Sequence, residues 1–123
     1  MQDKKILVID DEKDIANLIS HNLKKDGHIV HCLTDPKAAL IEVRKNIFYL
    51  VITDYGMPNL SGYNFLRKAR NNYSYAIMVT SSIPNSEGMQ LRLKKLVIEI
   101  FTKPIDMVRL RNTVGKIMTA GKI

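Results

Sequence analysis

Three carboxylates, a hydroxyl and an ammonium stand at the ends of short apolar runs in this chain of 123 residues. Asp10 and Asp11 follow the first such run, Asp54 follows the third, Thr80 ends the fourth and Lys103 follows the fifth. Apolar runs this short are typical of buried strands. If the strands are parallel, their carboxyl ends share one edge of a sheet, and these five side chains are expected to converge there.

Such a group of residues fits metal-assisted phosphoryl transfer. Carboxylates this close repel one another, and a divalent cation relieves the repulsion. Oxygen-only ligands favour Mg²⁺, and Asp11, Asp54 and one backbone carbonyl would suit it, with Asp10 close by or acting through water. A carboxylate also attacks phosphorus to form an aspartyl phosphate. Mg²⁺ would cover one oxygen of the transferred group, the Thr80 hydroxyl a second and Lys103 a third.

Each of these residues taken alone also has an ordinary structural interpretation. The Asp pair could cap a helix, and Asp54 could belong to a turn. Thr80 could simply end a strand, and Lys103 could be a surface lysine. Their joint occurrence, each at its own strand end, is what predicts a functional site.

The elements that must position these residues alternate along the chain. Apolar runs predict strands over 5–9, 28–33, 48–53, 76–80 and 96–102. Helical spacing and cap signals predict helices over 12–26, from 34–36 onward, over 62–70, between the loop 81–86 and about 95, and after a cap at Asp106. Continuously apolar strands are buried on both faces, so we expect an α/β, doubly wound, five-stranded parallel sheet with helices on both faces.

Length and composition fit a single domain over residues 1–123. The apolar runs are too short to span a membrane, and no membrane association is expected. One cysteine, Cys32, excludes an internal disulfide. The net charge of +7 is uneven: residues 1–61 carry 8 Lys/Arg and 9 Asp/Glu, whereas residues 62–123 carry 11 Lys/Arg and 3 Asp/Glu.

The basic half has more than one interpretation. It could be a solvated helix face, or it could bind nucleic acid, an anionic surface or an acidic protein partner. The chain shows no helix-turn-helix segment, so sequence-specific DNA binding by this chain is not expected, and an acidic protein partner is the better use of the charge. The residues concerned are Arg67, Lys68, Arg70, Arg92, Lys94, Lys95, Arg109, Arg111 and Lys116.

The sequence closely resembles the receiver (response regulator) domain of bacterial two-component systems over about residues 4–120. The matching pieces are Ile6-Leu7-Val8-Ile9-Asp10-Asp11-Glu12, Val51-Ile52-Thr53-Asp54-Tyr55-Gly56-Met57-Pro58, Gly62, Met78-Val79-Thr80-Ser81 and Phe101-Thr102-Lys103-Pro104. The resemblance implies a flavodoxin-like (β/α)5 fold with strand order 2-1-3-4-5.

The resemblance also implies roles for individual residues. Asp54 matches the phosphoacceptor, and Asp10 and Asp11 match the acidic metal pair that binds Mg²⁺ with Asp54 and the Gly56 backbone carbonyl. Thr80 and Lys103 match the phosphate-contacting hydroxyl and ammonium.

The same resemblance implies partners and a mode of action. The phosphoryl donor would be a phosphohistidine on a sensor histidine kinase or histidine phosphotransfer protein, or a small acyl phosphate. The domain would dephosphorylate itself, act as a switch rather than a turnover enzyme, and signal to a downstream protein or fused effector domain. A cytoplasmic location and a monomer or weak phosphorylation-dependent dimer are expected.

This sequence departs from the family pattern around its fourth helix and fifth strand, the usual output surface. Ile100 stands where members usually have Tyr or Phe, the aromatic of the switch. Phe101 is adjacent, but strand alternation points it to the opposite face. The interval from Thr80 to Lys103 is one residue longer than in some members, and 94–97 replaces a small-residue turn. These departures all fall on the output surface, whereas the residues of the phosphorylation chemistry match the family pattern.

Two alternatives remain open. One is a receiver-like interaction module with altered output coupling that uses the basic half. The other is a Mg²⁺-dependent phosphohydrolase with an aspartyl nucleophile. Such enzymes usually place a second Asp two residues after the nucleophile, and Gly56 at that position argues against this class.

Overall fold

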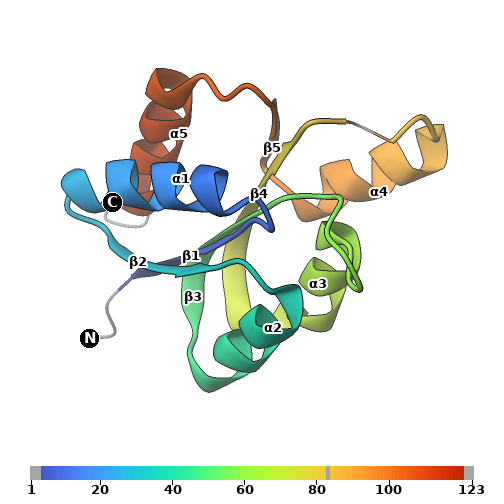
Figure 1. The fold of residues 1–123 in the computed structure, drawn as a ribbon, viewed down its shortest axis with the longest axis horizontal. Coiled ribbons are helices and arrows are strands. Elements are labelled where there is room, and N and C mark those ends of the chain that lie inside the picture. The colour runs from blue at the N-terminus through green and yellow to red at the C-terminus, as the bar shows by residue number, and fades with distance from the viewer. Residues whose placement is uncertain (1–3, 83, 121–123) are drawn as a thin grey trace.

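The computed structural model describes residues 4–82 and 84–120 and shows five strands that alternate with five α-helices (Figure 1). In chain order these are β1 (Lys5–Ile9), α1 (Lys13–Lys25), β2 (Ile29–Leu33), α2 (Pro36–Lys45), β3 (Phe48–Thr53), α3 (Gly62–Lys68), the 3-10 turn η1 (Arg70–Asn72), β4 (Tyr73–Thr80), α4 (Glu87–Leu96), β5 (Glu99–Thr102) and α5 (Met107–Ala120). Among the described residues, no helix combines the length and apolar character that crossing a bilayer requires.

All five strands are parallel and lie in the order β2-β1-β3-β4-β5. The predicted fold class and strand order are therefore confirmed. The order reverses at β1, because the chain moves from β1 to β2 on one side and to β3 on the other. In doubly wound sheets, ligands bind beyond the carboxyl ends of the strands at this reversal.

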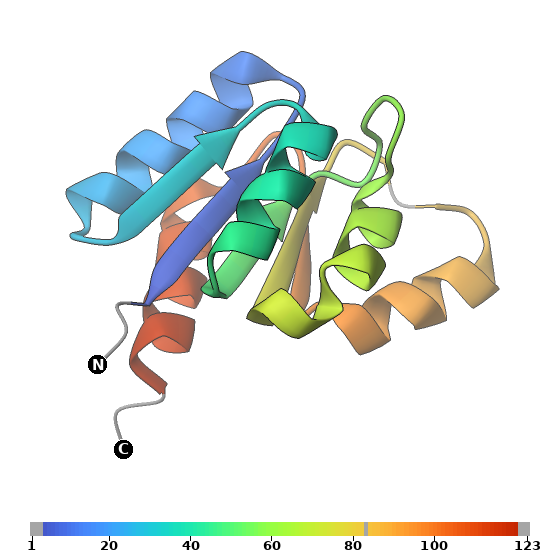
Figure 2. The same ribbon diagram turned by 90° about the horizontal axis from the view of Figure 1, so that it is seen from below.

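Helices cover the two faces of the sheet in two groups (Figure 1, Figure 2). Alternation along β1 sends Ile6 and Val8 to one face and Leu7 and Ile9 to the other. The first face packs against α1 and α5 through Ile19, Leu23, Leu110, Val114, Ile117 and Met118. The second packs against α2, α3 and α4 through Ala39, Val43, Phe65, Leu66, Ala69 and Leu93.

Three predicted boundaries were wrong by a few residues. β4 begins at Tyr73 instead of 76, because its first residues pair with β3 although Ser74 and Tyr75 are exposed. β5 begins at Glu99 instead of 96, because the apolar Leu96 ends α4 and packs on the core. The third helix ends at Lys68, and the chain continues as η1.

Helix ends follow the polar residues that the sequence offered as caps. Asp35 accepts a hydrogen bond from the Lys37 amide at the start of α2, where Pro36 is the first helical residue. Asp106 accepts one from the Arg109 amide at the start of α5. After α1, Gly27 takes a φ of +91°, a left-handed conformation that favours glycine.

Gly62 fixes the start of α3 against the loop after β3. Its amide donates to the Tyr55 carbonyl at 2.8 Å. A Cβ built on Gly62 would lie only 2.0 Å from the backbone oxygen of Asp54. Any larger residue would push the helix away from the end of β3, so this glycine holds together the strand end and the helix beyond it.

Replacing Gly62 with alanine should therefore lower the free energy of unfolding by roughly 1–3 kcal/mol, the usual effect of overpacking a tight site. Urea denaturation measures it. Gly115→Ala in α5 is the matched control, because a Cβ there meets nothing within 4 Å. That change should instead stabilise the protein by about 0.5–1 kcal/mol. Equal effects at both positions would contradict the close approach at Gly62.

Candidate functional site

Four of the predicted residues meet at the carboxyl edge of the sheet. Asp10 follows β1, Asp54 follows β3, Thr80 ends β4 and Lys103 follows β5. Backbone hydrogen bonds extend the strand pairing to two of them: the Asp54 amide donates to the Ile9 carbonyl at 3.1 Å, and the Lys103 amide donates to the Thr80 carbonyl at 2.9 Å. The sheet register therefore fixes where these side chains begin.

The Lys103 ammonium is the centre of the cluster. Its Nζ donates to Glu12 Oε1 at 2.9 Å and to Asp54 Oδ2 at 3.1 Å. It also lies 2.9 Å from Asp10 Oδ2, a close ion pair. The Lys103 side chain is 8% exposed, so these contacts lie in a largely desolvated place. One cation thus faces three carboxylates.

Asp10 is the most constrained of the three acids. It is 1% exposed, and its Oδ1 accepts a hydrogen bond from the Glu12 amide at 2.9 Å. Oδ2 of Asp10 is also buried, and it lies 2.9 Å from the Lys103 ammonium. Burial raises the pKa of Asp10 above its ordinary value, and the nearby Asp54 charge raises it further. Oδ2 is a buried oxygen that can still accept a ligand.

Lys103 responds in the opposite sense to the same surroundings. Burial alone would lower its pKa, but the contacts with Glu12, Asp10 and Asp54 outweigh burial and hold the pKa above the ordinary value. The ammonium therefore stays charged and supplies the counter-charge of the cluster. A buried charge without a counter-charge would lower the stability of the folded protein.

The three carboxylates are close enough to share a metal ion. One oxygen each from Asp10, Glu12 and Asp54 lies within 4.8 Å of the others. Carboxylate oxygens are the ligands of hard divalent cations such as Mg²⁺. The residues present thus fit a small divalent cation.

The remaining predicted ligands lie near this cluster but outside it. Asp11 is exposed at the loop after β1 and is not among the three acids that share the metal-sized space. Gly56 is exposed two residues after Asp54. Metal binding by Asp11 and by the Gly56 carbonyl stays a prediction.

The Thr80 hydroxyl is buried and held by the loop after β4. It donates to the Ser82 carbonyl at 3.2 Å and accepts from the Ser82 amide at 3.4 Å. The side chain stands at the end of β4, as predicted, and its hydroxyl is engaged by Ser82. The hydroxyl would have to give up the Ser82 carbonyl before it could donate to a group on Asp54.

Sequence reasoning missed Glu12 as a member of the cluster. It is exposed, stands at the N-cap of α1 and looks like an ordinary helix-start residue. The only indication in the sequence was that Glu12 lies two residues after Asp10. In the structure the Glu12 amide donates to Asp10 Oδ1, and the Glu12 carboxylate contacts the Lys103 ammonium.

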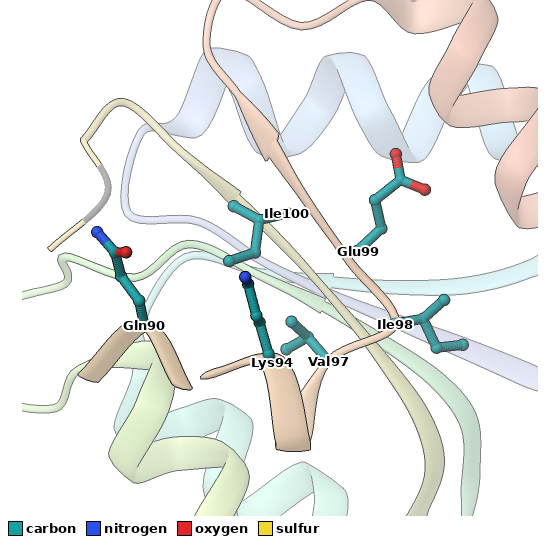
Figure 3. A pocket seen from close by; sticks show the side chains of 6 residues that line it. All are labelled: Gln90, Lys94, Val97, Ile98, Glu99 and Ile100. Carbon is teal, nitrogen blue, oxygen red and sulfur yellow. The ribbon is translucent and has the colours of Figure 1, made fainter. Parts of the chain in front are cut away.

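Ile100 and Phe101 lie on opposite faces of β5, as alternation predicted. Phe101 is 1% exposed in the α1/α5 core, with the Arg109 guanidinium 4.5 Å from its ring centroid. Ile100 points into a hollow of about 390 Å³, and the Lys94 side chain reaches into the same space (Figure 3). Phe101 is thus fixed in the core and cannot replace an aromatic at position 100 without unpacking it.

Comparisons with known proteins agree with this geometry. A family model described as the response regulator receiver domain matches residues 6–115. A response regulator receiver domain protein from Clostridium thermocellum is 29% identical, with a TM-score of 0.82, and the match covers 97% of each chain. The receiver domain of Francisella response regulator 1452 is 27% identical, with a TM-score of 0.81, over 97% of this chain and 99% of that chain.

A more distant structure shares the fold closely. A CheY-like receiver domain protein from Methanospirillum hungatei JF-1 is 22% identical, with a TM-score of 0.87, over 98% of both chains.

A divalent cation should stabilise this protein through the acidic cluster. With Mg²⁺ at about 100 times its dissociation constant, the free energy of unfolding should rise by about 2.7 kcal/mol, because only the folded chain holds the site. Thermal unfolding with and without Mg²⁺ measures the gain. Asp10→Asn should lose most of it, because the change removes a carboxylate that shares the metal-sized space.

The matched control is Glu87→Gln, which removes one exposed acidic charge in the first turn of α4, away from the cluster. This variant should keep the full Mg²⁺ effect. Equal loss in both variants would mean that Mg²⁺ acts on overall charge and not on this site.

Proposed function

The chain belongs to the response regulator receiver domain family, and we propose that Asp54 is the phosphoacceptor of its phosphorylation-dependent signalling. One observation carries the proposal: the buried Asp54 carboxylate contacts the Lys103 ammonium at 3.1 Å, at the carboxyl edge beside the reversal of strand order. The acceptor and the cation for a transferred phosphoryl group thus already lie together.

Asp54 would act as the nucleophile. One carboxylate oxygen forms a bond to phosphorus, and the bond from phosphorus to the donor nitrogen or oxygen breaks, with its electron pair leaving on the donor. The donor is a phosphohistidine of a sensor histidine kinase or histidine phosphotransfer protein, or a small acyl phosphate. Water later attacks phosphorus, the bond from phosphorus to the Asp54 oxygen breaks, and inorganic phosphate leaves. The chain thus returns to its starting state as a switch rather than a turnover enzyme.

Lys103 would stabilise the phosphoryl group as a point charge. Its contact with Asp54 needs only a short displacement to reach an oxygen on phosphorus, and charge-assisted contacts of this kind are strong. The Thr80 hydroxyl would turn from Ser82 to donate to a second oxygen. This exchange of partners would link the phosphorylation state of Asp54 to the loop between β4 and α4.

Mg²⁺ would be held by Asp10, Asp11, Asp54 and the Gly56 carbonyl, and when bound it supplies positive charge at the transferred oxygens. The close approach of Asp10 and Asp54 supports this assignment, because one oxygen of each lies within 4.8 Å of the other. Glu12 adds a further carboxylate to the same space. By holding Lys103, Glu12 also keeps the ammonium close to Asp54 before transfer.

The output is proposed to be a downstream protein or a fused effector domain, with the domain itself a monomer or weak phosphorylation-dependent dimer in the cytoplasm. Ile100 supports an altered output switch. It is half-buried beside the hollow at α4 and β5, where an aromatic ring would have space to move. The smaller Ile100 leaves that space open.

The phosphohydrolase alternative gains no support from the geometry. Gly56 offers no acid two residues after Asp54, and the acids near Asp54 are engaged by Lys103. Sustained turnover of a stable phosphate monoester would be the result that favours it.

Incubation with Mg²⁺ and acetyl phosphate or phosphoramidate should add the mass of one phosphoryl group to the intact protein. Asp54→Asn should abolish this gain, because the amide is not a nucleophile toward phosphorus. Intact-protein mass spectrometry measures both. Asp35→Asn is the control, because Asn caps a helix as well as Asp does and the α2 start is retained.

The control should gain mass like the unmodified chain. If native protein gains no mass from these donors or from a cognate kinase, or if Asp54→Asn still gains it, Asp54 is not the acceptor.

A further inference from the structure

A group of six cations covers the adjoining surface of α3, η1 and α4, outside the phosphoacceptor site. All six are exposed: Arg67, Lys68, Arg70, Arg92, Lys94 and Lys95. Within the described part of the chain, none of them lies within ion-pair distance of a carboxylate. By contrast, Arg109 and Arg111 pair with Glu99 and Asp26. The unpaired cations of the basic half are thus concentrated on α3, η1 and α4.

Three of these cations surround a hollow between the helices. Arg67, Arg70 and Lys95 line a space of about 310 Å³ together with Tyr63 and Leu96. α3 and α4 lie side by side at this edge of the molecule (Figure 1, Figure 2). Tyr63 and Leu96 are half-buried and pack on the core, so they give the hollow a firm, partly apolar floor.

One of the lining cations is already oriented. The Arg67 guanidinium lies 5.7 Å from the centroid of the Tyr63 ring, within the range of a cation–π contact. A guanidinium held in this way loses less conformational freedom when it binds a carboxylate through its two parallel N–H groups. Arg and Tyr are also the residue types that contribute most to protein interfaces.

The helix dipole alone does not explain the arrangement. Cations in the last turn of a helix are stabilised by its negative end, and Arg67 and Lys95 both stand in last turns. Arg44 and Lys45 stand in the last turn of α2 in the same way. The difference is that Arg67, Arg70 and Lys95, which come from three separate elements, line one hollow with a partly apolar floor, and the dipole does not require this convergence.

We propose that this α3–α4 hollow docks an acidic segment of a partner protein. Carboxylates of the segment would pair with Arg67, Arg70 and Lys95, and an apolar side chain between them would rest on Tyr63 and Leu96. The inference does not rest on phosphorylation of Asp54. It concerns a face separate from the hollow beside Ile100, which lies on the β5 side of α4.

A protein segment fits this hollow better than nucleic acid does. Nucleic-acid sites need a stripe of cations that follows successive phosphates, often with aromatic rings exposed for base stacking. Here three cations surround a single small hollow. The aromatic side chain among its described lining residues, Tyr63, is already in contact with the Arg67 guanidinium. A carboxylate pair flanking one apolar side chain matches both the charge and the size.

The test uses the full chain and a fluorescein-labelled peptide in which glutamates flank a single phenylalanine, followed by fluorescence anisotropy. The triple variant Arg67→Glu/Arg70→Glu/Lys95→Glu should weaken binding by about tenfold or more, because three attractive contacts become repulsive. The control Lys37→Glu/Arg44→Glu/Lys45→Glu makes the same change in net charge on exposed positions of α2, and should alter affinity by less than about twofold.

Circular dichroism and the phosphoryl mass gain verify that each variant is folded and keeps its Asp54 chemistry. If the triple variant is unfolded, the milder Arg67→Gln/Lys95→Gln takes its place, with a smaller loss expected. A peptide with serine in place of phenylalanine should bind more weakly, because it loses the contact with Tyr63 and Leu96.

Several results would overturn the proposal. These are no saturable peptide binding, equal loss in the α2 control, or equal affinity of the serine peptide. Tighter binding of a single-stranded oligonucleotide of matched charge, lost in the same triple variant, would assign the face to nucleic acid instead.

Discussion

The structure depends on one electrostatic constraint: two buried carboxylates and one exposed carboxylate meet at the carboxyl edge of the sheet, and one largely buried ammonium compensates them. Asp10, Glu12 and Asp54 all contact Lys103, whose side chain is almost fully buried. Removal of the ammonium would leave buried carboxylates without a counter-charge, which is costly. The cluster is therefore stable only with its cation in place. A bound metal ion would add positive charge to this cluster, and a phosphoryl group would add negative charge. The Lys103 ammonium contacts all three carboxylates and would therefore be affected by both changes.

The parallel sheet forms this cluster because it brings the carboxyl ends of its strands together. Parallel pairing of β1, β3, β4 and β5 places the ends of these strands at one edge, so residues as far apart in the sequence as Asp10 and Lys103 meet there. Gly62 lets α3 begin directly against the Asp54 backbone, which closes the loop after β3. The acids thus stand at the ends of paired strands, and the Thr80 hydroxyl at the end of β4 is held by Ser82 of the following loop.

Residues whose role follows from strand position could be predicted from the sequence. Asp10, Asp54, Thr80 and Lys103 were found because apolar runs mark strands and parallel strands share an edge. The opposite orientations of Ile100 and Phe101 followed from alternation. The participation of Glu12 could not be predicted in this way, because its carboxylate reaches Lys103 by a local turn at the start of α1. The convergence of Arg67, Arg70 and Lys95 also required the packing of α3 beside α4, which spacing along one helix does not reveal.

A crystal structure with Mg²⁺ and beryllofluoride tests the central claim most directly, because this phosphoryl analogue forms only on a competent acceptor. The account predicts beryllofluoride on Asp54, with Lys103 Nζ and Thr80 Oγ1 both contacting its fluorines, Mg²⁺ beside Asp10, and the Lys103–Glu12 contact lengthened or lost. Beryllofluoride absent from Asp54, or Lys103 still bound to Glu12 and Asp10 with Thr80 still on Ser82, would contradict it.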